Sequence, residues 1–110
     1  MRDTVIARSL AESDRLRAKH PGRVPVLISV DQKSDVCLSK TKYLVPGDMQ
    51  FGMFVASVRR RDCIDSSKSL IFFLENRLVP ASALLSEIWH SAEKPDGFLR
   101  LVVSQESTFG

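Results

Sequence analysis

The residue with the clearest chemical potential is Gly110, which stands behind Phe109 at the end of a short polar stretch. Its carboxylate has no side chain beside it, so an activating enzyme could adenylate it and pass it to a thiol with little steric hindrance. The absence of a Cβ atom also lets the backbone enter a narrow enzyme channel. A glycine at a chain end can equally have no role, because terminal residues are usually under weak constraint. The tail alone leaves both interpretations open.

Other residues give little support for catalysis or metal binding. His20 and His90 stand alone, without a cysteine or serine at a recognisable catalytic spacing. Cys37 and Cys63 form no metal-ligand pattern, and without an export signal both are expected to be reduced thiols in the cytosol. The sequence therefore predicts a protein that is not an enzyme, with no catalytic residue, no metal and no cofactor.

Composition places the chain among ordinary globular domains. Its 110 residues are 44% hydrophobic and 26% charged, with a net charge of +3, which predicts a single domain. No apolar run approaches the roughly 20 residues that a membrane-spanning helix needs. The run Arg59-Arg60-Arg61 could bind RNA or could be the solvated end of a helix. Because most aromatic residues fall at apolar periodic positions rather than among basic ones, we expect no nucleic-acid partner.

The elements that would position these residues follow from hydrophobic periodicity. Helices are predicted over 6–19, 51–61 and 80–94, and strands over 23–30, 41–45, 70–74 and 98–104. Asp48 and Ser82 are the candidate N-caps of the second and third helices. Alternation in the last strand divides its residues between two faces: Leu99, Leu101 and Val103 on one, and Phe98, Arg100 and Val102 on the other. Because two strands precede the second helix, the order indicates an α+β fold with a small mixed sheet.

The second predicted strand carries a candidate binding surface, Lys42-Tyr43-Leu44-Val45-Pro46. An edge strand with alternating apolar side chains and a nearby lysine can accept an extended peptide as an added strand. The same features also describe an edge strand that its lysine and proline protect against aggregation. Physical reasoning alone leaves these two interpretations open.

Several motifs occur together and in order along the chain: Arg23-Val24-Pro25-Val26, Lys42-Tyr43-Leu44-Val45-Pro46, Val58-Arg59-Arg60-Arg61, Leu70-Ile71-Phe72-Phe73 and Phe109-Gly110. In this combination the sequence resembles the autophagy ubiquitin-like modifiers, the family of GABARAP and the microtubule-associated light chain. The resemblance implies a ubiquitin-like β-grasp fold, a four-stranded mixed sheet with its first and last strands parallel at the centre. It divides the single domain into an N-terminal helical extension (1–22), the β-grasp domain (23–104) and a flexible C-terminal conjugation tail (105–110).

The resemblance also implies a life cycle that centres on Gly110. Ubiquitin-like activating and conjugating enzymes would transfer its carboxylate to phosphatidylethanolamine on autophagosomal membranes, and a family cysteine protease would remove it. The protein would be cytoplasmic, and peripheral on those membranes through the covalent lipid. It is expected to be monomeric.

Peptide reading is the other implied activity, directed at cargo receptors that carry an aromatic-x-x-aliphatic motif. Carried over position by position, the aromatic pocket comprises Glu12, Leu16, Pro25, Leu27, Lys42, Leu44 and Phe98. The aliphatic pocket comprises Ile28, Tyr43, Val45, Pro46, Met49, Phe54 and Val58. Lys42 and Arg61 would contact acidic residues that flank the motif.

The chain departs from the family pattern at a few positions. Ile6 stands where the family usually has Phe, His20 replaces a Tyr, and Ser57 replaces an apolar residue, which predicts a roomier aliphatic pocket. Three alternative functions stay open: an unconjugated peptide-binding adaptor, a modifier attached to protein lysines, and a basic RNA-binding module.

Overall fold

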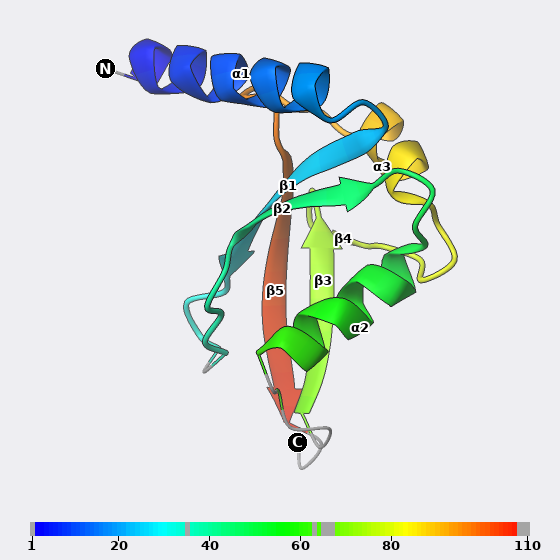
Figure 1. The fold of residues 1–110 in the computed structure, drawn as a ribbon. Coiled ribbons are helices and arrows are strands. Elements are labelled where there is room, and N and C mark those ends of the chain that lie inside the picture. The colour runs from blue at the N-terminus through cyan, green and yellow to red at the C-terminus, as the bar shows by residue number, and fades with distance from the viewer. Residues whose placement is uncertain (1, 35, 63, 65–67, 108–110) are drawn as a thin grey trace.

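The computed structural model describes residues 2–34, 36–62, 64 and 68–107, and Figure 1 shows their arrangement. Five strands form one sheet in the order β2-β1-β5-β3-β4. Their bounds are Arg23–Val30 (β1), Lys42–Pro46 (β2), Lys68–Leu74 (β3), Arg77–Leu78 (β4) and Leu99–Ser107 (β5). β1 and β5 run parallel at the centre, and the other pairs are antiparallel. The predicted β-grasp fold is thereby confirmed.

The prediction missed one strand, so the sheet has five strands rather than four. β3 turns directly into the two-residue strand β4 through Glu75 and Asn76, whose φ angles are 52° and 63°. Two successive residues with positive φ are typical of the tight turns that match the twist of a hairpin. A strand of two residues carries no periodic signal in the sequence.

The three helices are α1 (Arg2–Lys19), α2 (Phe51–Arg61) and α3 (Leu85–Ser91). The bounds of α2 match the prediction, whereas α1 begins four residues earlier than the predicted start at residue 6. The predicted cap Asp48 was wrong, because Gln50 precedes α2 and makes no capping hydrogen bond through its side chain. Instead, the first N–H groups of α2 donate to carbonyls of the segment before α3, from Phe51 to Ala83 and from Gly52 to Ala81, at 2.8 and 2.9 Å.

That same exchange explains why α3 begins at Leu85 rather than at residue 80 of the predicted helix over 80–94; α3 also ends three residues early, at Ser91. Residues 80–84 are held extended or in turns against α2, including a bridge between Gln50 and Leu84, and so cannot be helical. Ser82 is therefore not the cap. Leu84 precedes the helix, and its N–H donates to Oε1 of Glu87 at 2.9 Å.

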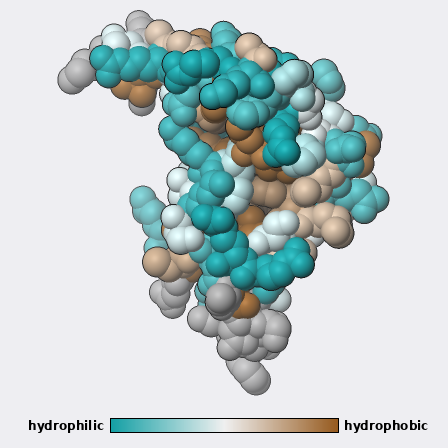
Figure 2. Space-filling view, viewed as in Figure 1, coloured by the Kyte–Doolittle hydropathy of each residue, from teal (hydrophilic) through white to brown (hydrophobic). Residues whose placement is uncertain are grey.

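The core lies between the sheet and α2. Leu99, Leu101 and Val103 of β5 are fully buried on this face, whereas Val102 is exposed, which confirms the predicted alternation of these residues. Phe98 was predicted on the face of Val102 but is buried. The neighbouring Gly97 accepts a hydrogen bond from Ser13 of α1, so α1 packs against this end of the sheet. In Figure 2, apolar side chains show in the hollow between α1 and the rest of the domain, and hydrophilic ones cover much of the surrounding surface.

β5 continues to Ser107, three residues beyond the predicted end. Residues 105–107 pair with β3, as in the registers of Leu70 with Gln105 and Lys68 with Ser107. The polar character of this segment suggested a tail, but backbone pairing does not require apolar side chains at a sheet end. Residues 108–110, with Gly110 among them, lie outside the described residues.

Candidate functional site

β2 is an edge strand of the described sheet, as Figure 1 shows. Ile28 N–H donates to the carbonyl of Thr41 at 2.8 Å, and the register continues with Val26 opposite Tyr43 and Val24 opposite Val45. In an antiparallel ladder these alternate pairs exchange hydrogen bonds. The N–H and C=O groups of the residues between them, Lys42 and Leu44, therefore point toward the open edge.

Pro25 has no N–H group, but its position in β1 costs the sheet no hydrogen bond. It lies opposite Leu44, at a pair that exchanges no hydrogen bonds, and it precedes the first residue of β1 that pairs with β5, Val26 opposite Leu99. Among the described residues, one side chain reaches this edge: Nη1 of Arg23 donates to the carbonyl of Leu44 at 3.3 Å.

The predicted aromatic-pocket residues meet on the face of the sheet that carries α1. Nζ of Lys42 lies 3.2 Å from Oε1 of Glu12 and 5.7 Å from the centre of the Phe98 ring. Register places Pro25 and Leu27 beside Leu44 and Lys42 on this face. Leu16 is half-buried one helical turn after Glu12.

Ile28, Tyr43 and Val45 of the predicted aliphatic pocket lie on the other face, against Phe54 and Val58 of α2. Pro46, opposite Arg23 at the end of β2, has the register parity of Leu44 instead. The Tyr43 ring meets Phe54 edge to face with centroids 5.4 Å apart. Four members are buried in the core and can form only the floor of a pocket: Ile28, Val45, Phe54 and Val58. The half-buried members, Tyr43, Pro46 and Met49, are the ones a ligand could touch directly.

Ser57 projects from α2, where its hydroxyl donates to the carbonyl of Met53 at 3.0 Å. The hydroxyl is therefore satisfied within its own helix. Arg61 is exposed in the last turn of α2, where its cation complements the helix dipole.

Sequence reasoning missed a polar clamp beside Tyr43. Asp62 Oδ1 accepts hydrogen bonds from the N–H and the hydroxyl of Ser39 at 3.0 and 2.5 Å, which ties the segment before β2 to the end of α2. The Tyr43 hydroxyl and Asp62 Oδ2 are buried, and neither has a hydrogen-bond partner among the described residues. Burial raises the pKa of Tyr43, the nearby Asp62 carboxylate raises it further, and Arg61 opposes them.

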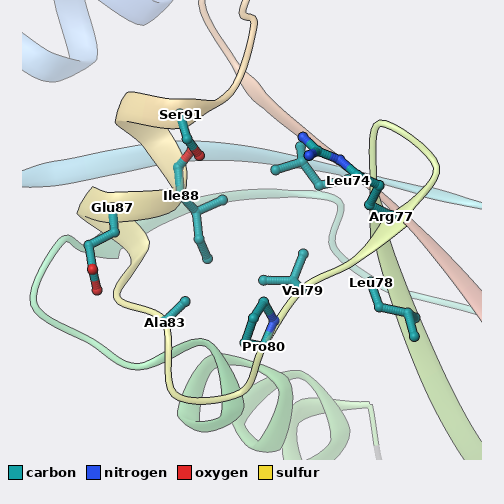
Figure 3. Close-up of a pocket in the computed structure, with 9 residues that line it drawn as sticks. All are labelled: Leu74, Arg77, Leu78, Val79, Pro80, Ala83, Glu87, Ile88 and Ser91. Atoms are coloured by element: carbon teal, nitrogen blue, oxygen red, sulfur yellow. The ribbon is translucent and has the colours of Figure 1, made fainter.

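A separate hollow lies at the opposite edge of the sheet, between the β3–β4 hairpin and α3 (Figure 3). Its volume is about 390 Å³, and Ile88 of α3 and Val79 face each other across it. Its lining residues all fall within one stretch of the sequence, from Leu74 to Ser91.

Two other classes of site, a membrane span and a metal centre, find no support in the described part of the chain. No helix of that part is long and apolar enough to cross a bilayer. The described residues also contain no cluster of three or more His, Cys, Asp or Glu residues arranged to hold a metal ion.

Comparison with known proteins extends these observations. The sequence model of the family described as "Autophagy protein Atg8 ubiquitin like" matches residues 8–110. Autophagy-related protein 8b of Arabidopsis thaliana is 45% identical over 102 residues, which cover 92% of this chain and 84% of that protein. Autophagy-related protein 8 of Emericella nidulans is 41% identical over 101 residues, covering 91% and 86%. The crystal structure of Trypanosoma brucei ATG8 has a TM-score of 0.85 at 30% identity, covering 96% of this chain and 91% of that one.

Proposed function

The chain belongs to the Atg8 ubiquitin-like family of autophagy proteins, and on that premise we propose that it is a modifier conjugated through Gly110 to phosphatidylethanolamine. On autophagosomal membranes it would recruit cargo receptors and autophagy factors that carry aromatic-x-x-aliphatic motifs. The chain would be the substrate of other enzymes rather than a catalyst.

Conjugation would proceed in four steps at the Gly110 carboxylate. An activating enzyme forms the acyl adenylate from ATP and releases pyrophosphate, and an enzyme thiol then displaces AMP to give a thioester. After transfer to a conjugating enzyme, the amine of phosphatidylethanolamine displaces the thiol and forms an amide. A family cysteine protease would hydrolyse this amide and return the Gly110 carboxylate and free phosphatidylethanolamine. Stable anchoring needs two acyl chains, and this lipid supplies two.

The observation that carries the peptide-reading half of the proposal is the geometry of β2. Its open edge offers the backbone groups of Lys42 and Leu44 to an added strand. In an extended peptide, residues i and i+3 point to opposite faces. The two candidate pockets also lie on opposite faces, one beside Phe98 and one beside Phe54, which suits an aromatic and an aliphatic anchor three positions apart.

A reconstituted conjugation reaction tests the modifier proposal. The full chain is incubated with activating and conjugating enzymes of the family, ATP and vesicles that contain phosphatidylethanolamine, and the product is identified by mass spectrometry. We expect an adduct of one lipid at Gly110, and none with Gly110→Ala. An adduct on protein lysines instead would establish the alternative modifier, and an unmodified chain that still binds motif peptides would establish the unconjugated adaptor.

A further inference from the structure

A concave site lies just beyond the end of β2, where α1 ends, β1 begins and α3 packs. Its volume is about 300 Å³. Arg17, Arg23, Ser86 and His90 supply its polar walls, and Trp89 supplies an aromatic wall. Among the described residues that line it, none is an aspartate or a glutamate. The site therefore presents positive charge without a built-in counter-ion.

The floor of this basic cavity is held by backbone hydrogen bonds between three segments. Gly47 N–H donates to the carbonyl of Gly22, and Ser86 N–H donates to the carbonyl of Gly47, both at 2.9 Å. A Cβ atom at Gly47 would stand 3.2 Å from that Gly22 oxygen and 3.3 Å from Cβ of Ser86. The segments are thus packed closely, and the cavity exists before any ligand arrives.

Two arginines are placed to bind an anion there. The Arg17 guanidinium lies over the Trp89 ring at 4.9 Å from its centre, an arrangement that leaves the in-plane N–H groups available to donate. Arg23 makes its 3.3 Å hydrogen bond to the carbonyl of Leu44, an acceptor that faces the open edge of β2. An added strand would take that carbonyl and release the Arg23 side chain toward the cavity.

We propose that the basic cavity binds the carboxylate or phosphate of an acidic segment that continues from a peptide paired with β2, past Pro46. This inference rests on the proposed peptide reading and adds a second contact to it. The cavity begins at Gly47, the residue after β2, so a strand on the edge leads directly to it.

The position of the cavity favours a peptide over a lipid headgroup. α1 and α3, which frame the cavity, lie at one end of the molecule, and β5 carries the chain toward Ser107 at the other end (Figure 1). If the membrane is joined through Gly110, the cavity faces away from it.

The test uses Trp89 as a local reporter, because it is the single tryptophan of the chain. Three peptides share one aromatic-x-x-aliphatic core: a neutral peptide, one with three aspartates before the core and one with three after it. Each is titrated into the full-length protein and into Arg17→Gln, with Arg8→Gln as a control that removes the same charge from the same helix outside the cavity. Binding is followed by calorimetry and by Trp89 emission.

We expect one of the two acidic peptides to bind about fivefold more tightly than the neutral peptide and to shift Trp89 emission. That gain should disappear in Arg17→Gln and persist in Arg8→Gln. The other acidic peptide leads toward Lys42 and Arg61, so Arg17→Gln should leave its affinity unchanged.

The two proposals fail in different ways. If the neutral peptide does not bind, the peptide-reading function is wrong. If it binds normally but neither acidic peptide loses affinity in Arg17→Gln, the cavity proposal is overturned. Anionic vesicles of phosphatidylserine that shift Trp89 emission in an Arg17-dependent way, where the peptides do not, would assign the cavity to lipid and overturn the peptide.

Discussion

Replacing Ser13 with alanine should loosen α1 from the sheet. Ser13 is buried at 1% exposure, and its hydroxyl donates to the carbonyl of Gly97 at 2.5 Å. The two residues are in close contact, since a Cβ atom at Gly97 would stand only 2.8 Å from Cβ of Ser13. Gly97 has a φ of +84°, which glycine adopts easily. Its lack of a Cβ atom also lets α1 pack closely against it. The substitution removes the donor and leaves the carbonyl facing the helix unpaired.

The expected change in unfolding free energy is the difference of two opposing effects. Leaving this half-buried acceptor without its donor costs about 1–2 kcal/mol. Alanine has a higher helix propensity than serine, which returns about 0.5 kcal/mol. The net destabilisation of Ser13→Ala is therefore about 1 kcal/mol, or a fall in Tm of about 4 °C for a chain of this length. Ser9 lies one turn earlier in α1, and Ser9→Ala should show only the propensity gain.

Thermal unfolding of the two variants, followed by calorimetry, separates these effects. Ser13→Ala should melt below the parent protein and Ser9→Ala slightly above it. Affinity for a neutral motif peptide should also fall about two- to threefold in Ser13→Ala, because α1 positions Glu12 and Leu16 beside the edge strand. Equal melting temperatures for Ser13→Ala and Ser9→Ala would show that the helix is held by apolar packing alone and would refute this account of its docking.

Three further outcomes follow from the geometry. Leu44→Pro removes an N–H that points to the open edge, so motif peptides should bind about tenfold more weakly than to Leu44→Ala, while equal affinities would argue against strand addition. Burial raises the pKa of Asp96, but hydrogen bonds, chiefly from Arg100, outweigh it and lower that pKa overall. Ionised Asp96 therefore stabilises the fold above the unfolded pKa of about 4, and this stabilisation is lost as pH falls through the lower folded pKa. Acid should destabilise the parent protein more than it destabilises Arg100→Gln, as measured by urea unfolding at a series of pH values. Tyr43, the single tyrosine, can be titrated by ultraviolet absorbance, and Asp62→Asn should lower its raised pKa, whereas an unchanged titration would assign that shift to burial alone.

Local sequence pattern was sufficient to predict the bounds of β1 and α2. β1 and α2 have the predicted bounds, because β-branched residues fill the first and Phe51, Phe54 and Val58 repeat at helical spacing in the second. α3 was predicted too long because its preceding segment satisfies the N-terminal N–H groups of α2 instead of extending its own helix. A hydrogen-bond exchange between segments some 30 residues apart leaves no periodic trace in the sequence.

In the candidate site, too, the pocket residues could be predicted from the sequence, whereas the long-range hydrogen bonds could not. The resemblance supplied the residues of both pockets. Alternation along β2 separates Lys42 and Leu44 from Tyr43 and Val45, but it does not place Pro46 with the aliphatic set. The clamp from Asp62 to Ser39 and the bond from Ser13 to Gly97 join residues 23 and 84 positions apart. Each is a contact between polar side chain and backbone, for which hydrophobic periodicity carries no signal.

Burial decides which residues can report on peptide binding. Val45 and Val58 belong to the predicted aliphatic pocket, yet they are 3% and 0% exposed and pack in the core. Truncating either one creates a cavity that costs about 1–3 kcal/mol of stability, so a lost interaction could reflect partial unfolding. Met49 is half-buried at the edge of the same set, and its truncation changes the ligand-facing surface with less disturbance of the core. Weaker peptide binding by Met49→Ala at an unchanged Tm would therefore be stronger evidence for this pocket than any effect of the two valines.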